Sequence, residues 1–295
     1  MGFAWGINPL SDLTPQLAIL TALSFVIITV VSAIGAQLNT LNDHELDSNE
    51  PRKQYLVLAT NALGKLKLKS VITVEFIVCL AFVVPFLILA KPVLLCLWAV
   101  AMFLTYAYNV PPLRFKSRSW LAMLTLLLVL SILPITFVYY STTSELNLVF
   151  LLFLAGQTMT VYAVIIPTET RDYFSDKAND VNTLTVRIGL AKASLLAMLM
   201  LGLGGALMIT AFTLALANKY PILSLFLLTM VAADFIVLRN YKRLYSLSKE
   251  YASSKESLTA EEIVQLSANN PKWITLVSQS IVFMSIILLV AKFLP

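Results

Sequence analysis

The sequence predicts an all-α integral membrane protein with a single domain over residues 1–295. Hydrophobic residues make up 59% of the chain, charged residues only 13%, and the mean hydropathy is +0.83. A soluble domain would carry about 25% charged residues. Several apolar runs are as long as a bilayer-spanning helix, which needs about 20 residues. The longest polar stretch, residues 239–272, is too short for a second domain, and we expect it to form a partly helical connection.

The apolar runs predict eight membrane-spanning helices. The first follows an N-terminal stretch that lacks the basic residues of a signal peptide. The third is the shortest and ends at Pro111 and Pro112, which cannot continue a helix. The sixth contains Gly202, Gly204 and Gly205, which we expect to allow close helix packing. The expected spans are residues 15–38, 70–90, 92–110, 120–140, 146–167, 190–217, 219–238 and 273–294.

The basic residues predict the orientation of these helices. Of 21 Lys and Arg, only Lys91, Lys219 and Lys292 fall at one end of the expected bundle. The other 18 lie in or beside the loops at the opposite end. Because loops rich in Lys and Arg stay in the cytoplasm, we expect that end to be cytoplasmic. The net charge of +5 thus reflects topology and contact with lipid headgroups, and nothing in the chain predicts binding to nucleic acid.

Half of the 16 acidic residues lie in two short stretches, 43–50 and 169–180, each directly after an apolar segment. In the first stretch, Asn39, Asp43, Asp47 and Glu50 are separated by four, four and three residues, and Pro51 then ends the helix. Residues at this spacing share one face of a helix. The second stretch repeats the arrangement with the residues Glu169, Asp172, Asp176 and Asp180.

Carboxylates gathered at a membrane are costly unless a partner neutralises them, and they are usually functional. Two such faces turned toward one cavity would repel each other unless cations lay between them. Oxygen ligands of this kind suit Mg²⁺, which readily shares a substrate phosphate. The alternative is that the acids simply mark the water boundary at the helix ends.

Basic residues close to both acidic stretches predict an anion site. The loop after the third span carries Arg114 and Lys116. Arg binds phosphate oxygens in a bidentate manner, and Lys acts as a point charge. Each cation alone could be a membrane anchor, but together they outline a diphosphate site. The other members are Arg52 and Lys53 after the first stretch, and Arg171 and Lys177 within the second.

At these residues the chain resembles the UbiA superfamily of intramembrane prenyltransferases. Three features agree in kind and order: the Asn39–Asp43 acidic motif, the Tyr-x-x-Pro-Pro-Leu-Arg-x-Lys loop over residues 108–116, and the acidic motif at 169–176. The last runs into Thr-Leu-Thr-Val-Arg-Ile-Gly at 183–189, and the resemblance covers nearly the whole chain.

The chain also departs from the family pattern. Glu169 stands where Asp is usual, and Leu46 stands at the expected second Asp of the first motif. Either Asp47 takes that role after a small shift, or residues are missing before it, in which case residues 47–53 resemble the lycopene elongase-like branch. The family has nine spans, two of them before the first motif, whereas one is expected here.

The resemblance implies a Mg²⁺-dependent enzyme that ionises an isoprenyl diphosphate and transfers the prenyl group to a lipophilic or aromatic acceptor. The tail would lie among the spans, in contact with membrane lipid. The implied metal ligands, direct or through water, are Asn39, Asp43, Asp47, Glu169, Asp172, Asp176 and Asp180, with Glu50 less central; Asp43, Asp47, Asp172 and Asp176 carry catalysis. The implied diphosphate ligands are Asn39, Arg52, Lys53, Tyr108, Arg114, Lys116, Arg171 and Lys177.

Two alternatives remain at this stage. A terpene cyclase on the same scaffold would let the cation close on itself, and the altered first motif keeps this open. A cation-coupled transporter would instead place its acids near the bilayer midplane. Of the remaining titratable residues, we expect His44 to point away from the acidic face and Asp234 to pair with Arg239 or Arg243.

Overall fold

The computed structural model describes residues 1–7, 14–48, 53–178, 181–217 and 220–294. In that part of the chain every regular element is a helix, and eight helical segments are long and apolar enough to cross a membrane. The fold class and the number of spans are therefore confirmed. The spans are α2 (Pro15–Ser48), α4 (Lys65–Ile88), α5 (Pro92–Asn109), α6 (Ser119–Leu127) with η4 (Leu128–Ile132) and α7 (Leu133–Thr142), α8 (Leu148–Ala178), α10 (Leu190–Leu216), η5 (Leu223–Phe226) with α11 (Leu227–Ser254), and α12 (Ser257–Ala268) with α13 (Asn270–Phe293).

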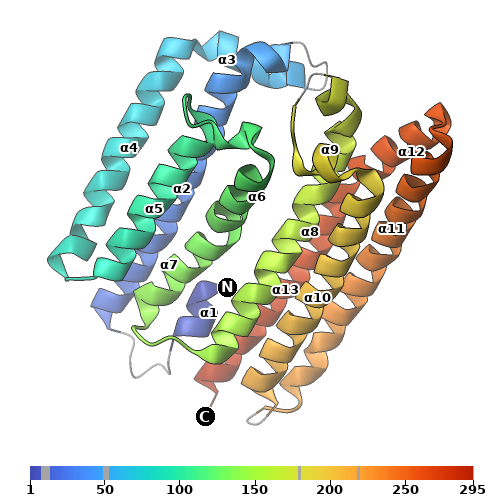
Figure 1. Cartoon of the computed structure of the whole chain (residues 1–295). Helices are drawn as coiled ribbons and strands as arrows, with labels where there is room; N and C mark the ends of the chain where they lie inside the picture. The colour runs from blue at the N-terminus through green and yellow to red at the C-terminus, as the bar shows by residue number, and fades with distance from the viewer. Residues whose placement is uncertain (8–13, 49–52, 179–180, 218–219, 295) are drawn as a thin grey trace.

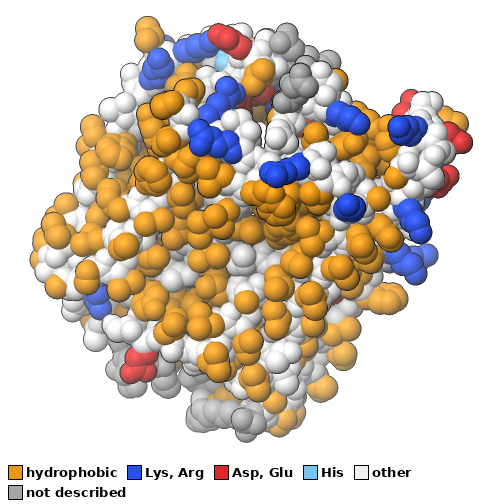
Figure 2. All heavy atoms as spheres, in the orientation of Figure 1, with side chains coloured by type: hydrophobic (Ala, Val, Ile, Leu, Met, Phe, Trp, Pro, Cys, Tyr) orange, Lys and Arg blue, Asp and Glu red, His pale blue; other side chains and the backbone are white. Residues whose placement is uncertain are grey.

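The helices stand in two groups, with α2, α4, α5 and α6–α7 on one side and α8, α10, α11 and α13 on the other (Figure 1). In the most apolar window of each span, only 17–39% of the residues are buried within the protein. The remaining apolar side chains form a broad hydrophobic surface around the molecule, as expected for contact with lipid. On the visible face, Lys and Arg gather at the end drawn uppermost (Figure 2). We call this the acidic-motif end, because it also carries both acidic stretches.

The two longest helices of the described chain extend well beyond the thickness of a bilayer, and their excess length carries the acidic motifs. Helix α2 has 34 residues and α8 has 31. At 1.5 Å per residue these lengths are roughly 50 Å and 46 Å, against about 30 Å of hydrocarbon. Both helices continue without a break through the acidic residues, to Ser48 and to Ala178. The expectation that each motif forms a helical face therefore holds for its described members.

The chain begins with a short buried helix, α1 (Gly2–Gly6), that the sequence analysis did not predict. A Cβ on Gly6 would meet Thr142 Oγ1 at 2.0 Å, and the Trp5 ring stacks on Phe153 with centroids 4.9 Å apart. The Lys292 ammonium donates hydrogen bonds to the carbonyls of Trp5 and Ile7, at 2.9 and 2.6 Å. These carbonyls lie at the helix C-terminus, where a cation is favourable. The Gly-x-x-x-Gly spacing was the available sequence signal.

Close packing of α8 against α10 depends on two glycines. A Cβ on Gly204 would lie 2.7 Å from the Gly156 carbonyl oxygen, and a Cβ on Gly156 would lie 2.7 Å from that of Gly204. A Cβ on Gly205 would meet Asp234 Oδ2 at 2.0 Å. The expected packing role is thus confirmed for Gly204 and Gly205 but is wrong for Gly202, where a Cβ would find only one atom, 3.8 Å away.

The structure also tests the predictions made for the side chains of Asp234 and His44. Asp234 is buried against Gly205, and within the described chain it forms no ion pair with Arg239 or Arg243, so that expectation was wrong. The His44 side chain points away from the acidic face, as expected, and His44 Nε2 hydrogen-bonds to Asn61 Oδ1 at 2.8 Å. Asn61 belongs to α3 (Gln54–Leu63), a short helix that was not predicted.

We expect Gly204→Ala to lower the thermal unfolding midpoint, because its new methyl group has no room between α8 and α10. Overpacking of this kind costs roughly 1–3 kcal/mol, more than the gain in helix propensity of about 1 kcal/mol. Gly202→Ala is the matched control on the same helix and should leave the midpoint unchanged or raise it. Equal midpoints for the two variants, measured by scanning fluorimetry in detergent, would contradict this account of the interface.

Candidate active site

The first acidic face lies on the last three turns of α2 and is neutralised by a basic loop. Asp43 Oδ1 accepts a hydrogen bond from Arg114 Nη2 at 3.1 Å and also contacts the Lys116 ammonium. Lys116 Nζ donates a second hydrogen bond to Asn39 Oδ1 at 3.2 Å. The Asp43 and Lys116 side chains are each only 13% exposed. Burial lowers the pKa of Lys116, and the contact with Asp43 partly offsets this.

The backbone of the loop directs its cations toward α2. Arg114 has φ 33° and ψ 59°, a left-handed conformation that residues other than glycine seldom adopt. Its N–H donates to the Val110 carbonyl at 3.0 Å, which closes the turn after α5. Asn109, which is buried, donates to the Thr105 and Gly35 carbonyls at 2.9 and 3.4 Å and so ties the end of α5 to α2. A strained backbone held by such contacts is typical of a functional site.

Asp47 lies one turn further along α2 and is only 4% exposed. Its Oδ1 accepts a hydrogen bond from Lys53 Nζ at 2.8 Å. The structure thus brings together Asn39, Asp43, Asp47, Lys53, Arg114 and Lys116 from the predicted set. Glu50, Pro51 and Arg52, which the sequence analysis also singled out, lie outside the described residues.

In the second acidic face, Glu169 is held by the segment that follows α8. Its Oε2 accepts hydrogen bonds from the backbone N–H of Thr185 at 2.9 Å and from the Thr185 hydroxyl at 2.8 Å. Thr185 is in the first turn of α9 (Leu184–Ile188), where Thr183 caps the helix by accepting from the Val186 N–H at 3.3 Å. Glu169 therefore ties the Thr-Leu-Thr-Val-Arg segment to the acidic helix.

Asp172 is paired with the preceding residue. Arg171 donates two parallel hydrogen bonds to it, Nε to Oδ1 and Nη2 to Oδ2, each 2.8 Å long. This fork is the geometry by which Arg recognises carboxylates and phosphates. Asp176 is partly buried one turn further along, and Asp180 lies outside the described residues. Lys177 does not point to this face, because its ammonium lies 5.7 Å over the Tyr173 ring, on the side of α8 that turns to α10 and α11.

Tyr108 links the two acidic faces electrostatically. It lies near the end of α5, just before the basic loop, and the charges of both Glu169 and Asp43 act on its hydroxyl. Tyr162, two turns before the second motif on α8, is likewise within range of Glu169. Both acidic faces therefore lie near Tyr108, at the same end of the bundle.

No group of three or more His, Cys, Asp or Glu side chains in the described part of the chain is arranged to hold a metal ion. Asp43, Asp47 and Asp172 instead pair with Arg or Lys. This arrangement does not provide a cage made of protein ligands alone. It fits Mg²⁺, which typically uses one or two carboxylates together with substrate phosphates and water.

Below the second motif, Pro167 interrupts the hydrogen bonding of α8. Proline has no N–H, so the carbonyl of Ala163, four residues earlier, loses its helical donor. The buried Tyr241 hydroxyl of α11 donates to that carbonyl at 3.1 Å. Asn270, at the start of α13, donates to the Val164 carbonyl at 2.9 Å and to Thr168 Oγ1 at 3.3 Å. The sequence analysis missed this support, although a proline two residues before an acidic motif was a signal that the helix needs one.

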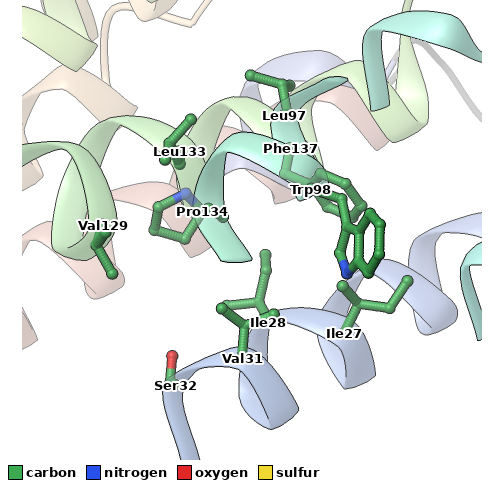
Figure 3. A pocket seen from close by; sticks show the side chains of 11 residues that line it. Ile27, Ile28, Val31, Ser32, Leu97, Trp98, Val129, Leu133, Pro134 and Phe137 are labelled. Carbon is green, nitrogen blue, oxygen red and sulfur yellow. The ribbon is translucent and has the colours of Figure 1, made fainter. Parts of the chain in front are cut away.

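An apolar cavity of about 30 Å³ lies deeper in the bundle, between α2, α5 and α7 (Figure 3). Ile28 and Ser32 from α2 face Trp98 of α5 and Pro134 of α7 across it. Ser32 precedes Asn39 by seven residues, so the cavity lies below the first acidic motif on the same face of α2. The π-helical turn η4 forms part of its wall through Val129. Such turns are frequent at functional sites.

Comparisons with known proteins agree with this architecture. The model of the UbiA prenyltransferase family matches residues 1–252. A solved structure of a UbiA homolog from Archaeoglobus fulgidus bound to DMAPP and Mg²⁺ has a TM-score of 0.57 to this chain at 19% identity, covering 94% of this chain and 92% of that one. The same homolog bound to Cd²⁺ has a TM-score of 0.54 at 19% identity, with the same coverage. No curated protein matches the chain.

The fold and the two acidic faces define an all-α, multi-pass integral membrane protein with a polar site at one end of its helices. Because the family match extends over most of the sequence, the chain belongs to the UbiA prenyltransferase family. The resemblance found in the acidic motifs and the basic loop is thereby confirmed. The reaction class of this family is the transfer of a prenyl group.

We expect Tyr241→Phe to impair the site without removing any proposed ligand. The variant leaves the Ala163 carbonyl buried without a donor, which costs roughly 1–3 kcal/mol and loosens α8 just before Glu169. The unfolding midpoint should fall, and binding of a prenyl diphosphate should weaken. Tyr245→Phe, further along α11, is the control. A Tyr241→Phe protein with unchanged stability and unchanged binding would contradict the supporting role of this hydroxyl.

Proposed function

We propose that this chain is a Mg²⁺-dependent prenyltransferase that ionises an isoprenyl diphosphate and transfers the prenyl group to a lipophilic or aromatic acceptor. The observation that carries the proposal is the pair of acidic helix faces near Tyr108, each with its own basic side chains. The distant Archaeoglobus homolog binds DMAPP and Mg²⁺, which supports the same ligands here.

Asn39, Asp43 and Asp47 on α2, with Asp172 and Asp176 on α8, would hold Mg²⁺ between the helices. Asp180 is a further candidate by its spacing. Glu169 is more specialised, because one of its carboxylate oxygens is already occupied by Thr185. We assign it mainly to positioning α9. When bound, Mg²⁺ would supply Lewis-acid neutralisation of the diphosphate charge.

The basic side chains would change partners when the substrate enters. Arg114 and Lys116 now neutralise Asp43, Lys53 neutralises Asp47, and Arg171 neutralises Asp172. A diphosphate offers the same cations stronger acceptors. Arg52 is a further candidate by its place after the first motif. Lys177 is left out of this set, because it faces a different pocket.

The chemistry then breaks the bond between the allylic carbon and the diphosphate oxygen, which leaves with the electron pair. Preorganised cations stabilise that developing negative charge. The acceptor carbon supplies the electron pair for the new carbon–carbon bond and afterwards loses a proton. The low-polarity interior keeps water from the allylic cation. We assign to the Tyr108 hydroxyl a contact with the diphosphate or the ionising carbon, because Tyr108 lies near both acidic faces.

The prenyl tail would run from the acidic face of α2 toward the apolar cavity. Ser32 lies roughly 10 Å below Asn39 along the helix axis, about the length of two isoprene units. The cavity is small, so a longer tail must move side chains or extend toward lipid. We place the acidic-motif end in the cytoplasm, because 18 of the 21 Lys and Arg belong to it.

The function is tested by supplying purified protein with C10 to C20 allylic diphosphates and a lipid extract, with Mg²⁺ or EDTA. Diphosphate release is measured, and the organic phase is analysed by mass spectrometry. The proposal predicts Mg²⁺-dependent release that requires the extract and yields a product heavier by one prenyl unit. Diphosphate release without the extract, with a cyclic hydrocarbon or alcohol as product, would show a terpene cyclase in place of a transferase. No release with any chain length would refute it.

Asp43→Asn and Asp172→Asn should each reduce kcat at least 100-fold, because each removes a charge from the proposed metal site while conserving size. Glu262→Gln, on the exposed face of α12, is a control that removes one negative charge elsewhere. All three proteins should remain folded, although Asp43→Asn should lower the unfolding midpoint because it leaves Arg114 and Lys116 without their carboxylate. Near-normal kcat in either aspartate variant would remove that residue from the site.

Ala101→Phe should shorten the accepted prenyl chain, since Ala101 lines the apolar cavity and the larger ring would fill it. Turnover with the C10 diphosphate should persist, and turnover with the C20 diphosphate should fall about tenfold or more. The C10 substrate serves as the internal control for folding. An equal effect on both substrates would mean that the tail follows another path.

A further inference from the structure

A second polar pocket lies at the acidic-motif end, outside the proposed active site. It has a volume of about 350 Å³ and lies between the end of α8, the start of α10 and the end of α11. Three lysines line it, Lys177 from α8, Lys192 from α10 and Lys255 just after α11. Among the described residues that line the pocket, none is acidic. The pocket is therefore strongly cationic.

The three lysines have no competing partner among the described residues. Lys177, Lys192 and Lys255 form neither an ion pair nor a hydrogen bond there through their side chains, and all three are exposed. Lys177 lies over the Tyr173 ring. This contrasts with Lys53, Arg114, Lys116 and Arg171, each of which pairs with an aspartate. Like charges around one hollow are unfavourable unless an anion joins them.

The pocket walls are partly apolar and rest on a buried hydrophobic cluster. Tyr173 and Leu190 belong to a buried cluster with Leu244 and Ile263, which fixes the ends of α8, α10 and α11 relative to one another. Lys255 has φ 55°, an uncommon conformation for a residue with a side chain, and its N–H donates to the Tyr251 carbonyl at 2.9 Å. The N-terminus of the 27-residue helix α10 adds a partial positive charge on the same side.

From this geometry we infer a second anion site that binds a phosphate-bearing ligand between Lys177, Lys192 and Lys255. Basic pockets between helices at a membrane interface bind the headgroups of anionic lipids. The pocket is much larger than one phosphate group, and its wall includes Ile188 and Leu190, which suits a phospholipid headgroup with its glycerol. Inorganic diphosphate carries the same chemistry from solution. The site is independent of the proposed transferase reaction.

Native mass spectrometry of the detergent-solubilised full chain tests the inference. The probes are phosphatidylglycerol, phosphatidylcholine and inorganic diphosphate, each titrated alone and the last also in competition. Wild type should retain one phosphatidylglycerol more tightly than phosphatidylcholine. The double variant K192Q/K255Q should weaken that binding roughly tenfold or more. Each lysine near an anionic lipid surface adds favourable electrostatic free energy, and losing two of them corresponds to a change in affinity of about this size. K65Q/K67Q, on α4, removes the same charge elsewhere and should bind as wild type.

The competing outcomes separate the two sources of the ligand. Displacement of the lipid by micromolar diphosphate, or retention of diphosphate alone, would support the site with a soluble ligand. Equal binding by the pocket variant and the α4 control would overturn the inference. Both variants should elute as monodisperse protein, and K192R/K255R should restore binding, because it restores the charge. Failure of that restoration, with folding intact, would also overturn it.

Discussion

The charge balance at one end of the bundle is the constraint on which the rest of the site depends. A membrane protein that carries carboxylates at its helix ends must neutralise them, because partly desolvated charges are costly. Here Asp43, Asp47 and Asp172 each have their own Lys or Arg. These ion pairs stabilise the protein when no ligand is bound. They also contain the carboxylates and cations that a Mg²⁺–diphosphate complex would need. When the substrate binds, the basic side chains can then exchange the aspartates for the diphosphate, and the aspartates can exchange the basic side chains for Mg²⁺, without leaving any charge unpaired.

That balance requires the helices to hold their acids at fixed positions beyond the hydrocarbon. The excess length of α2 and α8 supplies the reach, and each extension is held by other elements. The loop after α5 fixes the first motif through Arg114 and Lys116. Tyr241 and Asn270 repair α8 around Pro167, and Thr185 holds Glu169 just beyond it. Distant parts of the sequence thus position a few carboxylates.

Composition and helical spacing were enough to predict the spans, the acidic faces and the basic loop, because these features are local in the sequence. Lys116 pairs with both Asn39 and Asp43, which are more than 70 positions away in the sequence. The sequence could therefore predict that these residues share one site, but not which of them pair. Helix α1 was missed because it is too short to show an apolar period, and the turn η4 was missed because its residues simply continue the apolar run of the fourth span. The separate environment of Lys177 was missed because adjacent helix positions point about 100° apart, so closeness in sequence did not place it on the acidic face.

The central claim is that the metal enters with the diphosphate, because the resting carboxylates are already paired. Electron paramagnetic resonance can count bound Mn²⁺, used in place of Mg²⁺, with and without a non-hydrolysable prenyl diphosphate analogue. The account predicts weak Mn²⁺ binding to the protein alone and tight binding, abolished by Asp43→Asn, once the analogue is present. Equally tight Mn²⁺ binding with and without the analogue, or none in either case, would contradict it.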